Sequence, residues 1–220
     1  MTTNIWTLVA RVIVLLLTLP FHESAHALAA DKLGDPTPRS EGRISLNPFR
    51  HLSFVGTMAL LLLGFGWAKP VGIDSRYFKK PRRDMALVAL AGPMANVLLA
   101  FVWYCIYKVA IYTSFLADVA TTPFMDNAFT VISMIILINI QLAVFNLLPI
   151  PPLDGSKILG FFLPAKIQYY MLRYERYIML LVFALLYLNV LNKPISFLSN
   201  GLLTALDFLT RPIDLLFRAL

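Results

Sequence analysis

The chain has 220 residues, of which 59% are hydrophobic and 14% are charged. Soluble domains are about 45–50% apolar and about 25% charged, so this composition excludes a sizeable soluble domain and indicates an integral membrane protein. The formal net charge is +7, but the basic residues are spread along loops instead of one folded face, so we expect no nucleic-acid partner. Cys105 is the only cysteine, which excludes an intrachain disulfide.

Five apolar segments are candidate transmembrane helices, since a span needs about 20 predominantly apolar residues. In chain order they are 5–30, 85–112, 128–149, 174–191 and 195–217. The last is interrupted by polar residues, so a position in the membrane interface is the alternative for it. The sequence therefore predicts an all-α polytopic membrane protein with about five transmembrane helices, folded as a single domain over residues 1–220.

The distribution of lysine and arginine predicts the orientation of these helices. Basic residues cluster in three loops, 32–50, 76–83 and 157–176, whereas 113–127 contains neither lysine nor arginine. Because cytoplasmic loops carry the excess of Lys and Arg, we expect the three basic loops inside and 113–127 outside. The N-terminus then lies outside as well.

Residues 52–72 form a sixth apolar segment, between two of the basic loops. Both of its ends should be cytoplasmic, so we expect a re-entrant hairpin that turns at Gly64 and Gly66; a plain span is the alternative. The preceding stretch 39–46, RSEGRISL, partly alternates polar and apolar residues. We expect a short strand or small β-hairpin there, at the cytoplasmic membrane face, whose edge could pair with an extended peptide. An ordinary loop is the alternative.

The first apolar segment ends in an ionisable motif, His22-Glu23-Ser24-Ala25-His26, which has the spacing H-E-x-x-H. A charged side chain at the bilayer centre costs roughly 2.5–3.5 kcal/mol, so we expect a compensating partner such as a metal ion. Helix positions four apart share a face, so both imidazoles can bind one ion while Glu23 contacts a water on its open side. Two histidines, a third ligand and one open position are typical of catalytic zinc. A histidine pair that is hydrogen-bonded to neighbouring helices is the alternative.

A third ligand must also lie at membrane depth, and Asp154 best meets this condition. It lies in FNLLPIPPLDGSKIL, residues 145–159, where Pro149, Pro151 and Pro152 end the helix and favour extended backbone. Non-helical backbone at that depth occurs only where it is buried in protein or lines a watery cavity. The predicted topology also brings Asp154 to the membrane level of the two histidines. A proline-rich turn in which Asp154 has its ordinary turn role is the alternative.

Together these motifs make the chain resemble the site-2 protease family of intramembrane zinc metalloproteases. FHESAHALAADKLGDPTPRSEGRISLNP is similar to the first motif of that family, GFGWAKPV and DMALVALAGPMANVLLA to its middle, and FNLLPIPPLDG to its aspartate motif. The resemblance covers most of the chain, with a catalytic core at about 5–160. It implies one zinc ion per chain on His22, His26 and Asp154. It also implies Glu23 as the general base, with Asn146 in contact with the substrate backbone or the developing oxyanion.

One segment departs from the family pattern. The family often has N-P-x-x-H-[IL]-D-P after the first span, whereas this chain has NPFRHLSFVG, with Ser53 and Phe54 at the Asp-Pro positions. His51 is retained, and we expect either a substrate-side hydrogen-bond donor near the active site or a surface histidine. Asn96, in the second span, either orients the site or its substrate or packs between helices. PDZ and CBS accessory domains do not fit within 220 residues, so we expect a minimal member.

The resemblance implies hydrolysis of peptide bonds in membrane-spanning or membrane-adjacent substrates, by a zinc-activated water with a glutamate general base. We expect a membrane protein substrate and the lipid bilayer as partners. The expected location is the plasma membrane of a prokaryote, with the active site toward the cytoplasm. The alternatives are a non-catalytic zinc-binding membrane protein, such as a client-capturing pseudoprotease or a scaffold, and a metal transporter. A transporter would more naturally have polar residues along a full path, whereas here they cluster at one depth.

Overall fold

The computed structural model describes residues 5–63, 68–116 and 122–219. Its first element is one long helix in three parts: α1 (Ile5–Ile13), a π-helical turn η1 (Val14–Thr18) and α2 (Leu19–Lys32). The residues at the junctions keep right-handed helical dihedral angles, so the chain passes through them without a break. The predicted first span is therefore confirmed as a helix.

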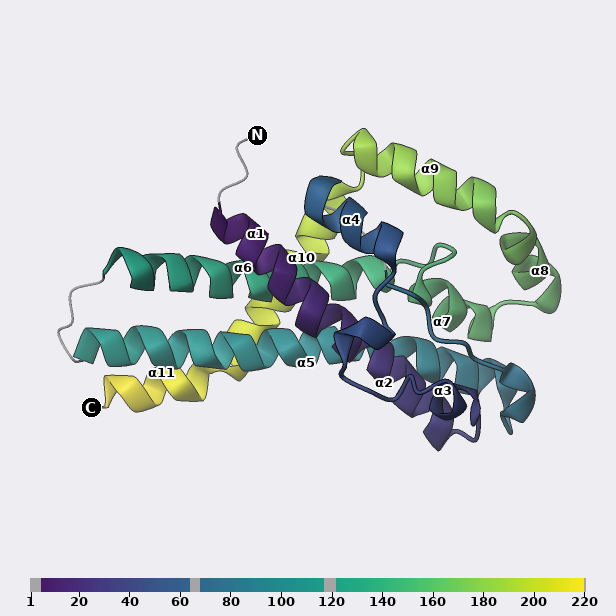
Figure 1. The fold of residues 1–220 in the computed structure, drawn as a ribbon, viewed down its shortest axis with the longest axis horizontal. Coiled ribbons are helices and arrows are strands. Elements are labelled where there is room, and N and C mark those ends of the chain that lie inside the picture. Colours follow the sequence, from purple (N-terminus) through teal and green to yellow (C-terminus); the bar gives the residue numbers. More distant parts are fainter. Residues whose placement is uncertain (1–4, 64–67, 117–121, 220) are drawn as a thin grey trace.

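Two further long helices pack side by side next to the first one (Figure 1). They are α5 (Pro81–Leu116) and α6 (Pro123–Asn146). Each begins at a proline, whose fixed φ suits the first helical turn. The Thr122 hydroxyl accepts a hydrogen bond from the Met125 N–H and so caps α6. At 1.5 Å per residue α5 is about 54 Å long, which exceeds the roughly 30 Å hydrocarbon core of a bilayer.

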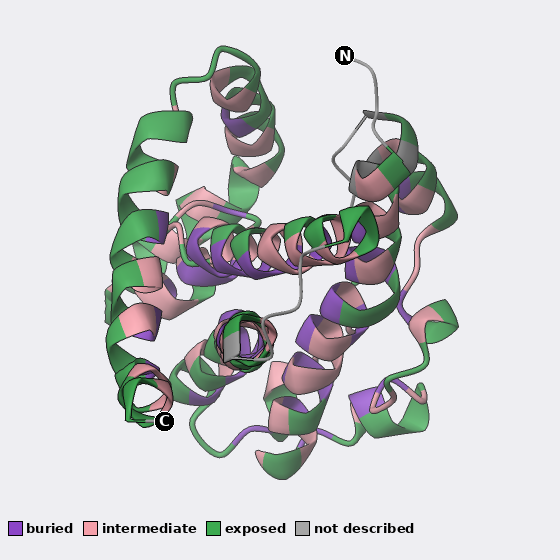
Figure 2. Cartoon of the chain, turned by 90° about the vertical axis from the view of Figure 1, so that its left-hand side faces the viewer, coloured by how far each residue is buried: buried purple, intermediate pink, exposed green. Residues whose placement is uncertain are grey.

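The core lies where these helices meet. Ala100 of α5 and Ile136 and Ile140 of α6 pack with Leu206 of α10 (Asn192–Leu209), and each of these four residues is almost fully buried. Buried residues face one another across the central helices, whereas the outer helices are mainly exposed (Figure 2). Many of the exposed side chains are large and apolar, as is expected of helices that contact lipid.

Three helices in the described part of the chain are long and apolar enough to cross a membrane: Leu8–Lys32, Pro81–Phe115 and Pro123–Asn146. They coincide with the first three predicted spans. The other two predicted spans correspond to α9 (Glu175–Tyr187) and α10, which are bent by 83° relative to each other and count as at most one broken span. α9 alone is about 20 Å long, shorter than the hydrocarbon core. The prediction of about five spans is therefore not confirmed, because three, or up to four, are found.

The two ends of the apolar segment 52–72 lie side by side. It contains the ten-residue helix α4 (Phe54–Leu63), and an isolated antiparallel bridge joins Leu52 to Ala68. The Lys69 N–H donates to the His51 carbonyl oxygen at 2.7 Å, so the two ends of the segment lie together. This arrangement agrees with the predicted hairpin and not with a plain span. Gly64 and Gly66, where the turn is predicted, lie outside the described residues.

The prediction of a strand at 39–46 is wrong. Thr37–Ser40 form the short helix α3, and the next regular element is the 3-10 turn η2 (Pro48–Arg50). Arg43 supplies the physical reason, because its buried side chain donates to backbone carbonyls of other segments and the loop folds around it. The backbone of 41–47 is therefore irregular.

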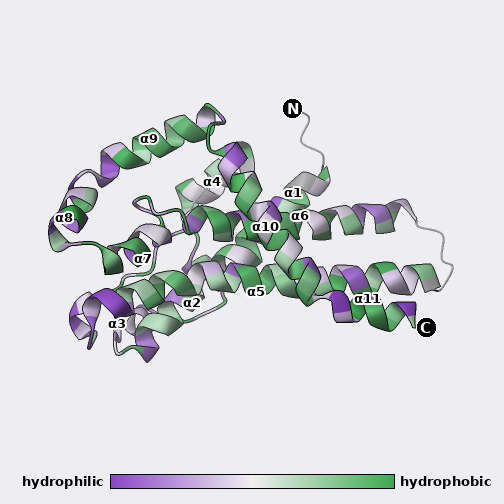
Figure 3. Ribbon diagram, turned by 180° about the vertical axis from the view of Figure 1, so that it is seen from behind, coloured by the Kyte–Doolittle hydropathy of each residue, from purple (hydrophilic) through white to green (hydrophobic). Residues whose placement is uncertain are grey.

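The remaining elements complete one end of the bundle and the C-terminal part. They are η3 (Ser75–Tyr77), α7 (Asp154–Phe162), α8 (Ala165–Arg173) and α11 (Arg211–Arg218). Hydrophobic residues predominate along α6 and the middle of α5, whereas hydrophilic residues gather around α3 (Figure 3). α7 packs against α5, which brings the aspartate motif to the same helix that α2 contacts.

Candidate metal centre

Three buried side chains from two distant stretches of the sequence converge at one end of the bundle. His22 and His26 lie one turn apart on α2, and Asp154 is the first residue of α7. His22 Nε2 lies 3.0 Å from His26 Nε2. Asp154 Oδ2 lies 3.4 Å from His22 Nε2 and 3.2 Å from His26 Nε2. The structure therefore brings together the three residues that were predicted to bind one metal ion.

The hydrogen-bond partners of the histidines indicate where a cation fits. His26 Nδ1 lies 2.7 Å from the Val88 carbonyl oxygen, which only accepts, so this nitrogen carries a proton and donates it. In the neutral imidazole, His26 Nε2 then presents a lone pair toward His22 and Asp154. Acceptor atoms so close repel one another unless a proton or a metal cation lies between them.

The distances between the donor atoms suit a small tetrahedral ion. Bonds of about 2.0–2.1 Å to nitrogen and oxygen, as zinc forms, place two ligands of a tetrahedron about 3.3 Å apart. The three measured separations are 3.0, 3.2 and 3.4 Å. The Val88 carbonyl also fixes the tautomer and orientation of one imidazole, as outer partners of metal ligands commonly do. The residues present therefore fit a zinc ion.

Two glycines allow other parts of the chain to approach these ligands. A Cβ atom on Gly92 of α5 would lie 2.3 Å from His26 Nε2 and 2.6 Å from His22 Cε1. A Cβ atom on Gly155 would lie 2.2 Å from the Leu147 carbonyl oxygen, just after the end of α6. Real Cβ contacts essentially never fall below 3.0 Å. Only glycine is therefore compatible with the observed position of either helix.

Asp154 remains ionised although it is buried. Two features of its surroundings favour the carboxylate form. Lys157 Nζ lies 3.4 Å from Asp154 Oδ1, the carboxylate oxygen that does not face the histidines. The position of Asp154 at the start of α7 also favours a negative charge on its side chain, because the N-terminal end of the helix dipole is positive. A carboxylate in this state can bind a metal cation.

Glu23 lies beside the cluster in sequence and is held by the backbone of a distant segment. Its carboxylate oxygen Oε2 accepts a hydrogen bond from the Val71 N–H at 3.3 Å. The segment 68–72, the last part of the predicted re-entrant hairpin 52–72, therefore lies alongside this side chain. The H-E-x-x-H pattern gives no signal for this contact, because it describes only residues within α2.

His51 is completely buried, so the expectation of a surface histidine is wrong. Its Nε2 lies 2.7 Å from the Ser45 carbonyl oxygen and 3.3 Å from Ser24 Oγ. Ser24 follows Glu23 directly, so His51 packs against the part of α2 that carries His22 and His26. These contacts engage Nε2 within the protein.

The two asparagines differ in their surroundings. Asn146 is the last residue of α6, is half-buried, and its Nδ2 donates to the Leu142 carbonyl oxygen at 2.9 Å. The close approach of Gly155 to Leu147 places Asn146 beside the start of α7. Asn96 is 1% exposed, and neither of its side-chain polar atoms has a hydrogen-bond partner among the described residues. It lies one helical turn beyond Gly92 on α5.

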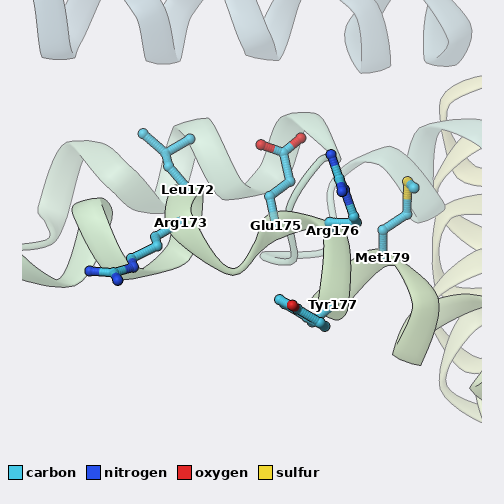
Figure 4. A pocket seen from close by; sticks show the side chains of 6 residues that line it. All are labelled: Leu172, Arg173, Glu175, Arg176, Tyr177 and Met179. Carbon is cyan, nitrogen blue, oxygen red and sulfur yellow. The ribbon is translucent and has the colours of Figure 1, made fainter.

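A concave surface between two C-terminal helices lies outside this centre. It is a cavity of about 500 Å³ at the junction of α8 and α9 (Figure 4). Its lining residues are Leu172, Arg173, Glu175, Arg176, Tyr177 and Met179. None of the predicted site residues lines it, so it carries no part of the metal chemistry.

Comparison with known proteins agrees with this geometry. The family model of peptidase family M50 matches residues 10–126 and 108–189, and the chain belongs to that family. The predicted membership in the site-2 protease family is therefore confirmed. A relative from Bacillus subtilis, named "Putative zinc metalloprotease YwhC", is 39% identical over 182 residues, which make up 83% of this chain and 81% of the relative.

Two further relatives carry the same type of name. The Mycolicibacterium smegmatis protein Rip2 is 28% identical over 186 residues, covering 81% of this chain and 66% of its own length. A Methanocaldococcus jannaschii protein is 36% identical over 139 residues, covering 63% of each chain. Both are named as zinc metalloproteases with the same qualifier as YwhC. No solved structure matches the chain.

Proposed function

We propose that this chain is an intramembrane zinc metalloprotease that hydrolyses peptide bonds of membrane-spanning or membrane-adjacent proteins. The observation that carries the proposal is the convergence of His22, His26 and Asp154 at one end of an apolar helical bundle, with Glu23 directly after the first ligand. Membership in peptidase family M50 supports the same chemistry. We assign one zinc ion to each chain.

The two histidines and the aspartate would hold the ion, and zinc bound there would act as a Lewis acid and lower the pKa of a water molecule to about 7. Glu23 is the general base in this proposal. One of its carboxylate oxygens is engaged by the Val71 N–H, and the other accepts the proton and passes it to the leaving amine. Its attachment to α2 one residue after His22 keeps it beside the reacting atoms.

The substrate peptide must be extended near these residues, because a helix encloses its own carbonyl groups. The chain from 147 to 153 is non-helical and connects α6 to Asp154 at the level of the metal ligands. We propose that an unwound substrate segment lies along this stretch, with the Asn146 amide in contact with its backbone or with the developing oxyanion. Asn146 has a spare amide hydrogen and an acceptor oxygen for this purpose.

The orientation follows from the distribution of basic residues. The ends of α2 and α6 and the beginning of α5 lie at the end of the bundle that contains the cluster. The adjoining loops are basic, and the positive-inside rule therefore supports our proposal that the centre faces the cytoplasm. Water for hydrolysis then enters from that side. We propose the plasma membrane of a prokaryote as the location and a membrane protein as the substrate, within a single domain.

Two substitutions test the proposal on the purified full-length chain with a membrane-anchored reporter. Glu23→Gln should retain zinc and lose cleavage, because the amide cannot accept a proton. Asp154→Ala should lose both zinc and cleavage, as measured by metal analysis and gel assay. A Glu23→Gln protein that binds zinc and cleaves at the wild-type rate would refute the base assignment. Full zinc content in Asp154→Ala would refute the ligand assignment.

A further inference from the structure

The loop that follows α2 contains a buried arginine that the metal centre does not explain. Arg43 is 5% exposed, although arginine is almost never fully buried unless it is paired. Its acidic neighbour Glu41 lies 3.7 Å from Nε, and the Glu41 side chain is 46% exposed. An ion pair that is this long and this exposed to solvent contributes little to stability. Other partners must compensate for the buried guanidinium.

Backbone carbonyl groups from two separate segments are these partners. Arg43 Nη1 donates to the Arg50 carbonyl oxygen at 2.5 Å and to the Lys69 carbonyl oxygen at 3.4 Å. Nη2 donates to the Pro70 carbonyl oxygen at 3.3 Å. The planar guanidinium can contact several acceptors at fixed angles, which an ammonium group cannot do. Arg43 therefore joins the chain at residue 50 to the chain at residues 69–70.

The same short segment is bonded to two other parts of the site. The Lys69 N–H donates to the His51 carbonyl oxygen at 2.7 Å, and His51 itself contacts Ser24 of α2. Pro70 has no N–H, so the next backbone donor is that of Val71, which contacts the Glu23 carboxylate. The two carbonyls that precede this donor are the ones that Arg43 binds. Their position sets the direction of the Val71 N–H.

We propose that Arg43 is a positioning residue for Glu23. By holding the carbonyls of residues 69 and 70, it directs the Val71 N–H at one carboxylate oxygen and leaves the other to accept a proton. This inference rests on the proposed function, in which Glu23 is the general base. Catalysis is sensitive to such placement, because a misplacement of about 1 Å can cost on the order of a hundredfold in rate.

The test compares variants of the full-length chain on the membrane-anchored reporter. Arg43→Met should lower kcat by about ten- to hundredfold while KM and zinc content stay near wild type. Arg43→Lys should recover only part of kcat, since a compact ammonium lacks the planar fork with which Arg43 contacts the carbonyls of residues 50, 69 and 70. Arg39→Met is the matched control: its guanidinium pairs with Asp31 and its side chain is 73% exposed. This control should cleave at the wild-type rate.

A double-mutant comparison separates positioning from a general structural role. Val71→Pro removes the N–H that contacts Glu23, and Val71→Ala keeps it. If Arg43 acts through this N–H, Val71→Pro should lose kcat to a similar extent and the Arg43→Met/Val71→Pro protein should be no worse than either single variant. Val71→Ala should remain active. Losses that multiply in the double variant would overturn the proposal.

Hydrogen exchange supplies a readout that does not depend on activity. Arg43→Met should accelerate amide exchange in the peptide that contains residues 68–72, while exchange in α2 is unchanged. Unchanged exchange there, or an unchanged kcat, would overturn the role of Arg43. A Glu23→Gln protein with wild-type cleavage would instead refute the assignment of Glu23 as the base in the proposed function, and the exchange result would still show whether Arg43 holds the segment.

Discussion

The close approach of Gly92 to the two histidines gives a sharp prediction for Gly92→Ala. The added methyl carbon would lie 2.3 and 2.5 Å from His26 Nε2 and Cε1, whereas ordinary contacts begin at 3.4 Å. One imidazole, or the whole of α5, must therefore shift by about 1 Å. Metal–ligand distances tolerate about 0.2 Å, so the shift exceeds the tolerance roughly fivefold. The His26 ring cannot rotate freely, because its Nδ1 donates to the carbonyl oxygen of Val88, which lies on α5 together with Gly92.

We expect Gly92→Ala to lower zinc affinity by at least about ten- to hundredfold and to reduce cleavage in parallel. Overpacking of this kind also costs about 1–3 kcal/mol of stability. Gly201→Ala is the matched control, because it lies in α10 and a Cβ atom there meets nothing within 4 Å. It should be neutral or slightly stabilising, since alanine favours the helix over glycine. Competition with a zinc chelator measures the affinity. A Gly92→Ala protein with wild-type affinity and cleavage would refute the described packing of α5 on α2.

Two further predictions concern other contacts. Gly155→Ala should reduce zinc content more than a typical helix substitution, because the methyl group would meet the Leu147 carbonyl oxygen of the backbone and displace the start of α7. Metal analysis measures the zinc content, and full occupancy would contradict the prediction. Lys108→Met should lower the free energy of unfolding by roughly 3 kcal/mol or less, and with it the melting temperature. Lys108 Nζ lies 2.9 Å from Asp207 and 2.7 Å from Asp214, so both carboxylates would lose this cation. Changing both aspartates to asparagine in that variant should restore part of the stability in a thermal-shift assay, and no recovery would argue against a charge effect.

The convergence of His22, His26 and Asp154 was predictable because each part of it depends on a local rule or on depth. The i, i+4 spacing of His22 and His26 is a property of one helix, and it holds in any tertiary arrangement. Asp154 was found by combining a proline-interrupted helix end with a topology drawn from lysine and arginine. The two lines of reasoning are independent, and both place Asp154 at the same end of the bundle as the two histidines.

The number of spans was harder to predict, because apolar composition does not fix the direction of a helix. Residues 174–191 and 195–217 each satisfy a hydropathy window, yet α9 ends at a turn in which Asn189 has φ of 59°, a left-handed conformation. Asparagine adopts this conformation more readily than other non-glycine residues. The 83° bend that follows makes one broken unit of two apparent spans. A hydropathy average contains no term for such a turn.

The backbone contacts of Arg43 were not predictable from the sequence, because counting charges treats every arginine in a basic loop alike. Arg39 and Arg43 both support the same topology, yet Arg39 is exposed and Arg43 is buried among backbone carbonyls. A carbonyl acceptor leaves no mark in the sequence, since every residue has one. Arg43 therefore differs from Arg39 in the backbone segments that lie within hydrogen-bonding distance of its guanidinium. For Arg43 that segment is 69–70, some distance along the chain, and its next N–H is bonded to Glu23.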